Sequence, residues 1–453
     1  MKVPDDQASA PDNHRPELGV VTRAVVWNQA LWTAGYALTT GGFFNYFSRE
    51  LGAGDRMLAL LLVIPETVGI LALATRPIVR RAGHRKTVWI GCSLFARLVS
   101  IGIPLLAFSA LRPTGEAALW TLAACLAASQ AAGGVAYIAL LSWLADLVPG
   151  DHWGRFFARQ QIADFSVLIV VPIAGGYAVD WWWKHATPDA LLLVYVVAFA
   201  LGIALQLASM IPLLRLPHVS RRSAAGSSAV AIRSSPDWTT IVASFRNRSL
   251  RFLLIHNWWL AAFNGMTQAV IFSYVSKNGP LNLTLGTYQV LSTIQRSVSI
   301  PVSWGSGWWA DRRGNKGLLI VGVLIAGGAS MPFWLAASPG QWWWVIGAYV
   351  LWGFWPAANI TGRNLVLKLS PRGDNTTQLA LFRQVGGLLA GLSGLLGGVW
   401  LASLKAADFA VDLPGYRIES YQLLFLISLL GRLTSTLWLL PIREPQTSEG
   451  RLT

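Results

Sequence analysis

The sequence has few charged residues and almost no cysteine. Only 13% of its 453 residues are Asp, Glu, Lys or Arg, whereas 54% are hydrophobic. Because soluble proteins carry about 25% charged residues, this composition argues against a water-soluble globule. The two cysteines, Cys92 and Cys125, fall within apolar runs, which excludes a disulfide framework and a cysteine-based zinc site.

Motifs of soluble catalysis are also missing. The six histidines are scattered, no His-Glu-x-x-His is present, and no Gly-x-x-x-x-Gly-Lys-Ser/Thr loop exists to bind ATP. We therefore expect no enzymatic activity, no metal and no cofactor. The net charge of +15 does not indicate nucleic-acid binding, because the basic residues are spread over many short loops and form no continuous stripe.

The hydrophobic residues form long consecutive runs separated by short polar segments. A run of about 18 or more apolar residues predicts a membrane-spanning helix, and the runs lack the period-two alternation of β-barrel strands. The sequence therefore predicts an all-α polytopic membrane protein. The first span is expected to be retained, since the polar segment before it lacks the apolar core of a signal peptide. The twelve expected spans cover residues 24–46, 57–79, 87–110, 117–146, 157–181, 190–214, 252–275, 283–310, 317–337, 341–369, 376–403 and 419–441.

The distribution of lysine and arginine predicts the orientation of these spans. Of the 36 basic residues, 25 lie in the two tails, the central polar segment and the loops on the same side, counted together with the span ends that adjoin them, and 7 lie in the opposite loops. The other 4 lie within spans: Arg97, Arg296, Arg383 and Arg432. Positive residues accumulate on the cytoplasmic side, so both tails are expected there. The expected divisions are a tail at 1–23, a six-helix lobe at 24–214, a linker at 215–251, a second six-helix lobe at 252–441 and a tail at 442–453.

The two halves of the chain are related by an internal repeat. The segment 44–49, Phe-Asn-Tyr-Phe-Ser-Arg, aligns with 272–277, Phe-Ser-Tyr-Val-Ser-Lys, at an offset of 228 residues. Farther along, Gly83 corresponds to Gly314, at an offset of 231. A six-helix unit duplicated in parallel predicts two pseudo-symmetric lobes around a central cavity, an architecture typical of transporters.

The loop between the eighth and ninth expected spans carries a recognisable motif. Residues 307–316 read Gly-Trp-Trp-Ala-Asp-Arg-Arg-Gly-Asn-Lys. This loop resembles the Gly-x-x-x-Asp-Arg-x-Gly-Arg/Lys-Arg/Lys loop of the major facilitator superfamily and differs only at the first of the two final basic positions. In the first-half copy, Arg76 and Arg80 stand where Gly and Asp are expected, while Arg81, Gly83 and Arg85 fit. The resemblance extends to the span count, the repeat and the linker, and it implies the twelve-helix fold of this superfamily.

In these loops we expect a conformational gate on the cytoplasmic side. Asp311 stands at a helix end, where its carboxylate can accept charge-assisted hydrogen bonds from Arg312 or a neighbouring helix, and Gly307 allows a neighbour to approach closely. The alternative is that the basic residues only mark topology. The expected gate residues are Gly307, Asp311, Arg312, Gly314, Lys316, Arg81, Gly83 and Arg85.

Ionisable side chains at membrane depth are costly, so each is a candidate for transport function. Glu66 and Asp164 are the acidic residues well inside spans. The arrangement implied by the superfamily sets Glu66 beside Arg383 and Asp164 beside Arg296. The alternative is that such pairs only hold helices together. The other candidates for coupling or substrate binding are Arg97 and the amides of the first and seventh spans, Gln29, Asn257, Asn264 and Gln268.

These features predict a secondary transporter that moves a small solute by alternating access. Proton coupling is favoured over sodium coupling, because titratable carboxyls are present and no cluster of sodium-coordinating oxygens is evident. The segment Pro172-Ile173-Ala174-Gly175-Gly176 matches the tail of the superfamily's antiporter motif, so a drug or metabolite efflux antiporter is the first alternative. A non-transporting membrane sensor on the same fold is the second. We expect a monomer in the bacterial inner membrane, with a small-molecule substrate, protons and the lipid bilayer as partners.

Overall fold

The computed structural model describes residues 18–68, 71, 75–108, 110–147, 153–187, 190–217, 242, 245–370, 378–379, 381–414 and 416–444. The N-terminal tail up to residue 17, most of the predicted linker and the C-terminal tail from residue 445 lie outside the described residues. The side chain of Asp311 lies outside them as well.

Helices account for almost all of the described first half, and they fall on the expected spans. Several of the expected spans contain two helices in series, because glycine or proline interrupts the run; for example, Gly41 has a φ of 57° between the first two helices. The helices are α1 (Leu18–Thr39), α2 (Gly42–Glu50), α3 (Asp55–Val68), α4 (Thr75–Ala82), α5 (Arg85–Ser100), α6 (Gly102–Leu105), α7 (Ala117–Leu147), α8 (Trp153–His185), α9 (Leu193–Ala208) and α10 (Met210–Leu214).

The second half repeats this pattern. Asn247 and Thr284 cap two of its long helices, each accepting a backbone hydrogen bond three residues later. The helices are α12 (Arg248–Val275), α13 (Leu285–Arg313), α14 (Lys316–Val323), α15 (Met331–Ala336), α16 (Trp344–Trp352), α17 (Trp355–Leu369), α19 (Gly386–Ala406) and α20 (Ser420–Ser435). Shorter turns are the π-helical η5 (Leu324–Ala329) and η7 (Leu381–Val385), and the 3₁₀-helical η6 (Pro339–Gln341) and η8 (Thr436–Leu439).

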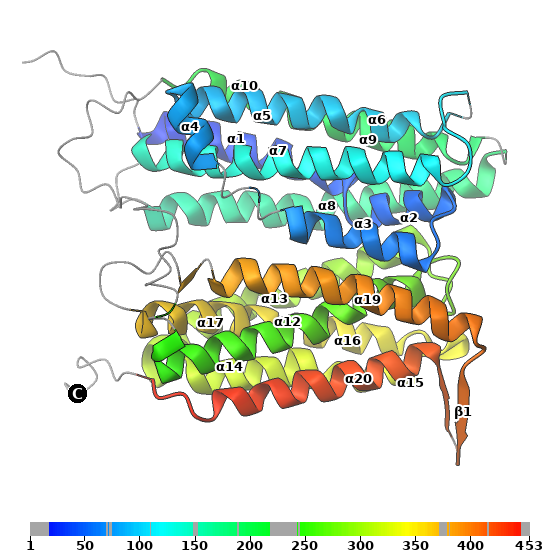
Figure 1. Cartoon of the computed structure of the whole chain (residues 1–453). Helices are drawn as coiled ribbons and strands as arrows, with labels where there is room; N and C mark the ends of the chain where they lie inside the picture. Colours follow the sequence, from blue (N-terminus) through cyan, green and yellow to red (C-terminus); the bar gives the residue numbers. More distant parts are fainter. Residues whose placement is uncertain are drawn as a thin grey trace, which may run out of the picture.

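One element departs from the all-α prediction. Strands β1 (Ala410–Leu413) and β2 (Tyr416–Glu419) form an antiparallel hairpin between α19 and α20. It projects from one end of the molecule, whereas the start of α1 and the last described residues lie at the other end (Figure 1). We call these the hairpin end and the tail end.

Seven described helical segments are long and apolar enough to span a membrane. The others are shorter or more polar. For example, α1 carries Asn28, Gln29 and Thr33, and α13 carries Gln295 and Arg296. Polar side chains on long helices of a membrane protein normally face the bundle interior or a water-filled cavity. The seven segments are Arg85–Leu105, Ala117–Leu141, Ile162–His185, Leu193–Leu214, Lys316–Ala336, Leu381–Ala406 and Ser420–Leu439.

The helices of the two halves form two adjacent groups, with α1–α10 above and α12–α20 below in Figure 1. They meet where α3 packs on α19 and α8 packs on α13. Glycines allow this approach: a Cβ at Gly391 would lie 3.0 Å from Thr67 Cγ2 and 3.3 Å from Val63 Cγ1. At the hairpin end, the core around Phe43 and Phe47 also includes Leu285 of the second half.

Side-chain contacts within the two halves also repeat. Asn28 Nδ2 donates to the carbonyl of Ser209 at 2.7 Å, and in the second half His256 Nδ1 lies 2.8 Å from the carbonyl oxygen of Ser435. The first contact joins α1 to the junction of α9 and α10, and the second joins α12 to the end of α20, at offsets of 228 and 226 residues. The sequence repeat therefore has a structural counterpart in how each half is held together.

Candidate functional site

Asp164 lies at the centre of a polar cluster between α8 and α1. Its Oδ1 accepts hydrogen bonds from Thr33 Oγ1 at 2.5 Å and from Gln29 Nε2 at 2.9 Å. Gln160 Nε2 in turn donates to Gln29 Oε1 at 2.7 Å. Because residues four apart share one face of a helix, two residues of α1 meet two of α8. Gln29 and Asp164 were separate candidates in the sequence, and the structure brings them together.

Arg296 reaches the same helix from the other half. Its Nη1 donates to the carbonyl of Leu168 at 2.8 Å, one helical turn from Asp164. The two charges are close enough to interact, although no direct ion pair joins these two described side chains. Arg296 thus lies near Asp164, as expected, but its direct hydrogen-bond partner is the backbone carbonyl of Leu168.

Glu66 and Arg383 lie near one another at the seam between α3 and α19. A Cβ at Gly387 would lie 3.5 Å from Glu66 Oε2, and the charges of Glu66 and Arg383 interact without a direct ion pair between them. Neither the Glu66 nor the Arg383 residue is buried by other protein atoms; both have accessible surface. An exposed carboxylate in the middle of a predicted span requires water or polar partners.

The seventh-span amides divide into two kinds. Asn257 Nδ2 donates to the carbonyl of Phe382 at 2.7 Å, which satisfies a backbone group of the π-helical turn η7, where Arg383 lies. Asn264 and Gln268 are exposed, four residues apart on α12. Arg97 lies on α5, where its Nε is buried without a partner, and it makes no hydrogen bond or ion pair with the other four described charged candidates.

The loop of residues 307–316 makes a sharp connection between α13 and α14. Gly314 has a φ of 83°, a left-handed conformation that favours glycine. Arg312 lies over the ring of Trp308, 4.2 Å from its centroid. A Cβ at Gly307 would meet no atom of the described residues within 4 Å, so no described helix makes the expected close approach at Gly307 in this conformation.

Glu444, which was not among the residues expected to form the gate, binds the loop of residues 307–316 through hydrogen bonds. Its carboxylate accepts hydrogen bonds from the backbone N of Asn315 and of Lys316, from Asn315 Nδ2, and from Lys368 Nζ, at 2.8 to 3.0 Å. Burial alone would raise the pKa of the Glu444 carboxyl, but these hydrogen bonds outweigh burial and hold the pKa below its usual value. The only feature of the sequence that pointed to Glu444 is its position directly after the last apolar run.

A lysine beside each loop ties it to the last helix of its own half. Lys316 Nζ donates to the carbonyls of Leu440 and Ile442 at 2.8 and 2.9 Å. In the first half, Lys86 Nζ donates to the carbonyls of Leu214 and Leu216 at 2.8 and 2.6 Å. The motif alignment assigned Arg85 to the position of Lys316, whereas Lys86 makes the matching contact. Gly83 has a φ of 77°, like Gly314, and Arg81 is exposed.

At the hairpin end, Asp55 joins the two halves. Its Oδ1 accepts hydrogen bonds from Arg49 Nη2 at 2.5 Å and from Ser273 Oγ at 2.8 Å, and its Oδ2 accepts one from Lys405 Nζ at 2.7 Å. Burial would raise the pKa of Asp55, but the hydrogen bonds and charges of Lys405 and Arg49 outweigh burial and hold the pKa below its usual value. We call this set of four residues the Asp55 latch.

Two further hydrogen bonds join the halves near the hairpin end. Tyr46 donates from its hydroxyl to the carbonyl of Leu283 at 2.7 Å, and Asp180 Oδ2 accepts from the backbone N of Gly286 at 3.0 Å. A Cβ at Gly176 would lie 3.0 Å from the Cα of Gly286. The second glycine of the partial antiporter motif therefore serves close packing here.

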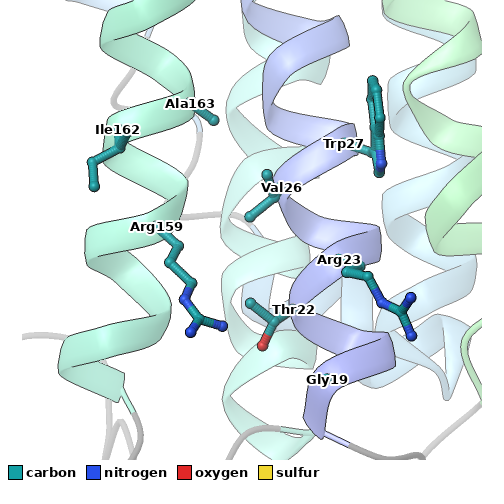
Figure 2. A pocket seen from close by; sticks show the side chains of 8 residues that line it. All are labelled: Gly19, Thr22, Arg23, Val26, Trp27, Arg159, Ile162 and Ala163. Atoms are coloured by element: carbon teal, nitrogen blue, oxygen red, sulfur yellow. The ribbon is translucent and has the colours of Figure 1, made fainter.

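A cavity of about 390 Å³ lies between α1 and α8, on the tail-end side of the Asp164 cluster. Figure 2 shows Arg159 and Thr22 directed into the space between the two helices, and Arg23 and Trp27 on the other side of α1. Both arginines are exposed. The cavity is therefore positively charged at the tail end.

Comparisons with known proteins agree with the motif and the fold. The sequence profile described as Major Facilitator Superfamily matches residues 25–395. The chain belongs to this superfamily. It is thus an integral membrane protein of a transporter family. No curated protein matches the sequence.

Solved structures of other transporters share the fold of this superfamily member. The nucleoside transporter NupG is 14% identical with a TM-score of 0.63, over 93% of this chain and 98% of NupG. A D-xylose-proton symporter is 16% identical with a TM-score of 0.63, over 94% of this chain and 98% of the symporter. A bacterial homologue of the iron transporter ferroportin, in its inward-facing state, is 14% identical with a TM-score of 0.62, over 94% and 98%.

Proposed function

We propose that the protein is a proton-coupled secondary transporter of a small solute. The observation that carries the proposal is the position of Asp164, in the tail-end half of α8, where it binds side chains of α1 and lies one turn from the contact of Arg296 with Leu168. A carboxylate that changes its hydrogen-bond partners when two lobes move can take up and release a proton.

The proposed architecture has twelve spans in two pseudo-symmetric six-helix lobes, residues 24–214 and 252–441, joined by a cytoplasmic linker at 215–251. Both tails are cytoplasmic in this proposal, so the hairpin end faces outward. The repeated contacts of Asn28 and His256 and of Lys86 and Lys316 support the pseudo-symmetry. The membrane is the bacterial inner membrane.

Alternating access follows from where the halves are joined. The Asp55 latch and the contacts of Tyr46 and Asp180 close the hairpin end, while the cavity between α1 and α8 lies toward the tail end. We assign this conformation to the inward-facing state. The outward-facing state requires these hydrogen bonds to break and the two lobes to rock about their seams, with Asp311 closing the cytoplasmic side.

The substrate is to be identified first, by thermal stabilisation of the purified protein with sugars, nucleosides, peptides, carboxylates and cationic drugs. Uptake of the stabilising compound into proteoliposomes is then measured with and without a pH gradient. We expect Asp164→Asn to lose pH-driven accumulation and to keep exchange, while Asp412→Asn, an exposed acid in the hairpin, behaves as wild type.

Each alternative has a different outcome in this assay. Unchanged pH-dependent uptake in both Asp164→Asn and Glu66→Gln would contradict proton coupling through these acids. Accumulation only in vesicles of inverted orientation would indicate efflux. Stabilisation by a ligand without any transport would indicate a sensor.

A further inference from the structure

Arg432 is a buried cation that the proposed transport pathway does not use. It lies in α20, is 1% exposed, and donates from Nη2 to Thr267 Oγ1 at 2.8 Å. Its Nε and Nη1 are buried, and neither has a hydrogen-bond partner among the residues that the structure describes. Within the described part of the chain, no carboxylate forms an ion pair with it. A buried charge without a partner is strongly unfavourable.

The internal repeat indicates that the helix contact itself needs no charge. In the first half, Gln206 Nε2 donates to Thr39 Oγ1, also at 2.8 Å. Gln206 and Arg432 are 226 residues apart, and Thr39 and Thr267 are 228 apart, so the two contacts are equivalent. In the first half, the neutral amide of Gln206 is thus sufficient to join α9 to α1, as Arg432 joins α20 to α12 in the second half. The positive charge of Arg432 therefore has a purpose other than this contact.

The surroundings of Arg432 leave its other donors unused. The hydroxyls of Thr267 and Ser428 already donate to the carbonyls of Asn264 and Phe263, at 3.2 and 2.8 Å. The π-helical turn η5 presents Gly327, where a Cβ would lie 3.6 Å from Arg432 Cβ. The side chain thus packs against backbone on this side, and its free N–H groups remain the strongest donors in the region.

We propose that Arg432 binds a small inorganic anion, of which chloride is the simplest example, inside the second half. The anion would neutralise the guanidinium and accept hydrogen bonds from Nε and Nη1. Because the side chain is 1% exposed, a solute as large as a sugar could reach it only if α12 and α20 separated. A monatomic anion occupies a far smaller volume than a sugar.

The test compares the wild type with Arg432→Gln, which installs the residue found at the equivalent position of the first half. Arg417→Gln, in the exposed hairpin, controls for the loss of one charge. Melting temperatures are measured in sodium chloride and in sodium gluconate at equal ionic strength. We expect a saturable increase with chloride in the wild type and in Arg417→Gln, and none in Arg432→Gln.

Binding of radioactive chloride to the wild type adds a measurement that does not depend on the folding of a variant, and bromide-soaked crystals should show an anomalous peak beside Arg432 Nε. Equal melting temperatures of the wild type in both salts, without bound chloride, would overturn the proposal. So would a full chloride response in Arg432→Gln. None of these readouts requires transport, so they stand apart from the proposed function.

Discussion

Replacement of Asp55 by asparagine tests whether the Asp55 latch sets the conformational balance. The substitution keeps the shape and the acceptor for Ser273 but removes the charge that attracts Arg49 and Lys405. A hydrogen bond to a charged group contributes about 1.5–3 kcal/mol, and an exposed ion pair about 0.2–1 kcal/mol. The side chain of Arg49 is 14% exposed and that of Lys405 is 39% exposed. The interaction of Asp55 with Arg49 is therefore assigned the energy of a charged hydrogen bond, and that with Lys405 the energy of an exposed ion pair.

We therefore expect the closed hairpin end to lose about 2 kcal/mol, roughly a thirty-fold shift toward the state open at that end. Acid should act in the same direction. The pKa of Asp55 is below its ordinary value in the closed state, so the latch is complete above that ordinary value, about 3.9. The stabilisation by the Asp55 latch is lost as the pH falls through the lowered pKa of Asp55.

The assay is a distance measurement between spin labels at Glu116→Cys and Ala407→Cys, both exposed and placed in the two halves, after replacement of Cys92 and Cys125. Asp55→Asn should add a population with a longer distance. Asp412→Asn is the control, because its nearest cation is 3.8 Å away in an exposed pair. An unchanged distance distribution in Asp55→Asn, with the protein folded, would refute the latch.

Three further predictions concern the side of the protein that is proposed to be cytoplasmic. Glu444→Gln should lower the unfolding free energy of the second half by about 1–2 kcal/mol, measured by thermal unfolding at neutral pH. Because the pKa of Glu444 is lowered in the folded protein, the difference in unfolding free energy between variant and wild type should disappear when the pH falls below that lowered pKa. A difference that stays constant at all pH values would contradict this prediction. Asp311→Asn should favour the inward-facing state and slow turnover more than it weakens binding; native turnover would leave the loop as a topology signal. Ser227→Cys should resist an impermeant reagent in intact cells, and its labelling there would invert the proposed topology.

The helices could be predicted from the sequence because long apolar runs leave few alternatives. The hairpin at 410–419 was missed, because its short strands lie in a loop and carry no long hydrophobic pattern. The π-helical turns η5 and η7 were missed as well, since they depend on contacts such as that of Asn257 with the Phe382 carbonyl. Such contacts are set by packing between helices distant in the sequence.

The candidate site was predictable in its residue types and less so in its partners. A carboxylate within an apolar run singled out Asp164, but its contact with Thr33 depends on which faces of α1 and α8 meet. Asp55 begins α3 and Glu444 directly follows the last apolar run; acidic residues are common at both kinds of position, so this signal did not single either residue out. Lys86 and Arg85 are adjacent, so the motif could not decide which one reaches the end of α10.

The contacts of Lys86 and Lys316 have a mechanical consequence. Each lysine fastens the start of one helix to the end of another within the same half, so each half resists bending. In the proposed alternating-access cycle, motion is then concentrated in the seams, where α3 meets α19 and α8 meets α13. In the proposed cycle the two halves move as stiff bodies, and the angle between them, not the curvature of any helix, adjusts to the volume of the proposed solute.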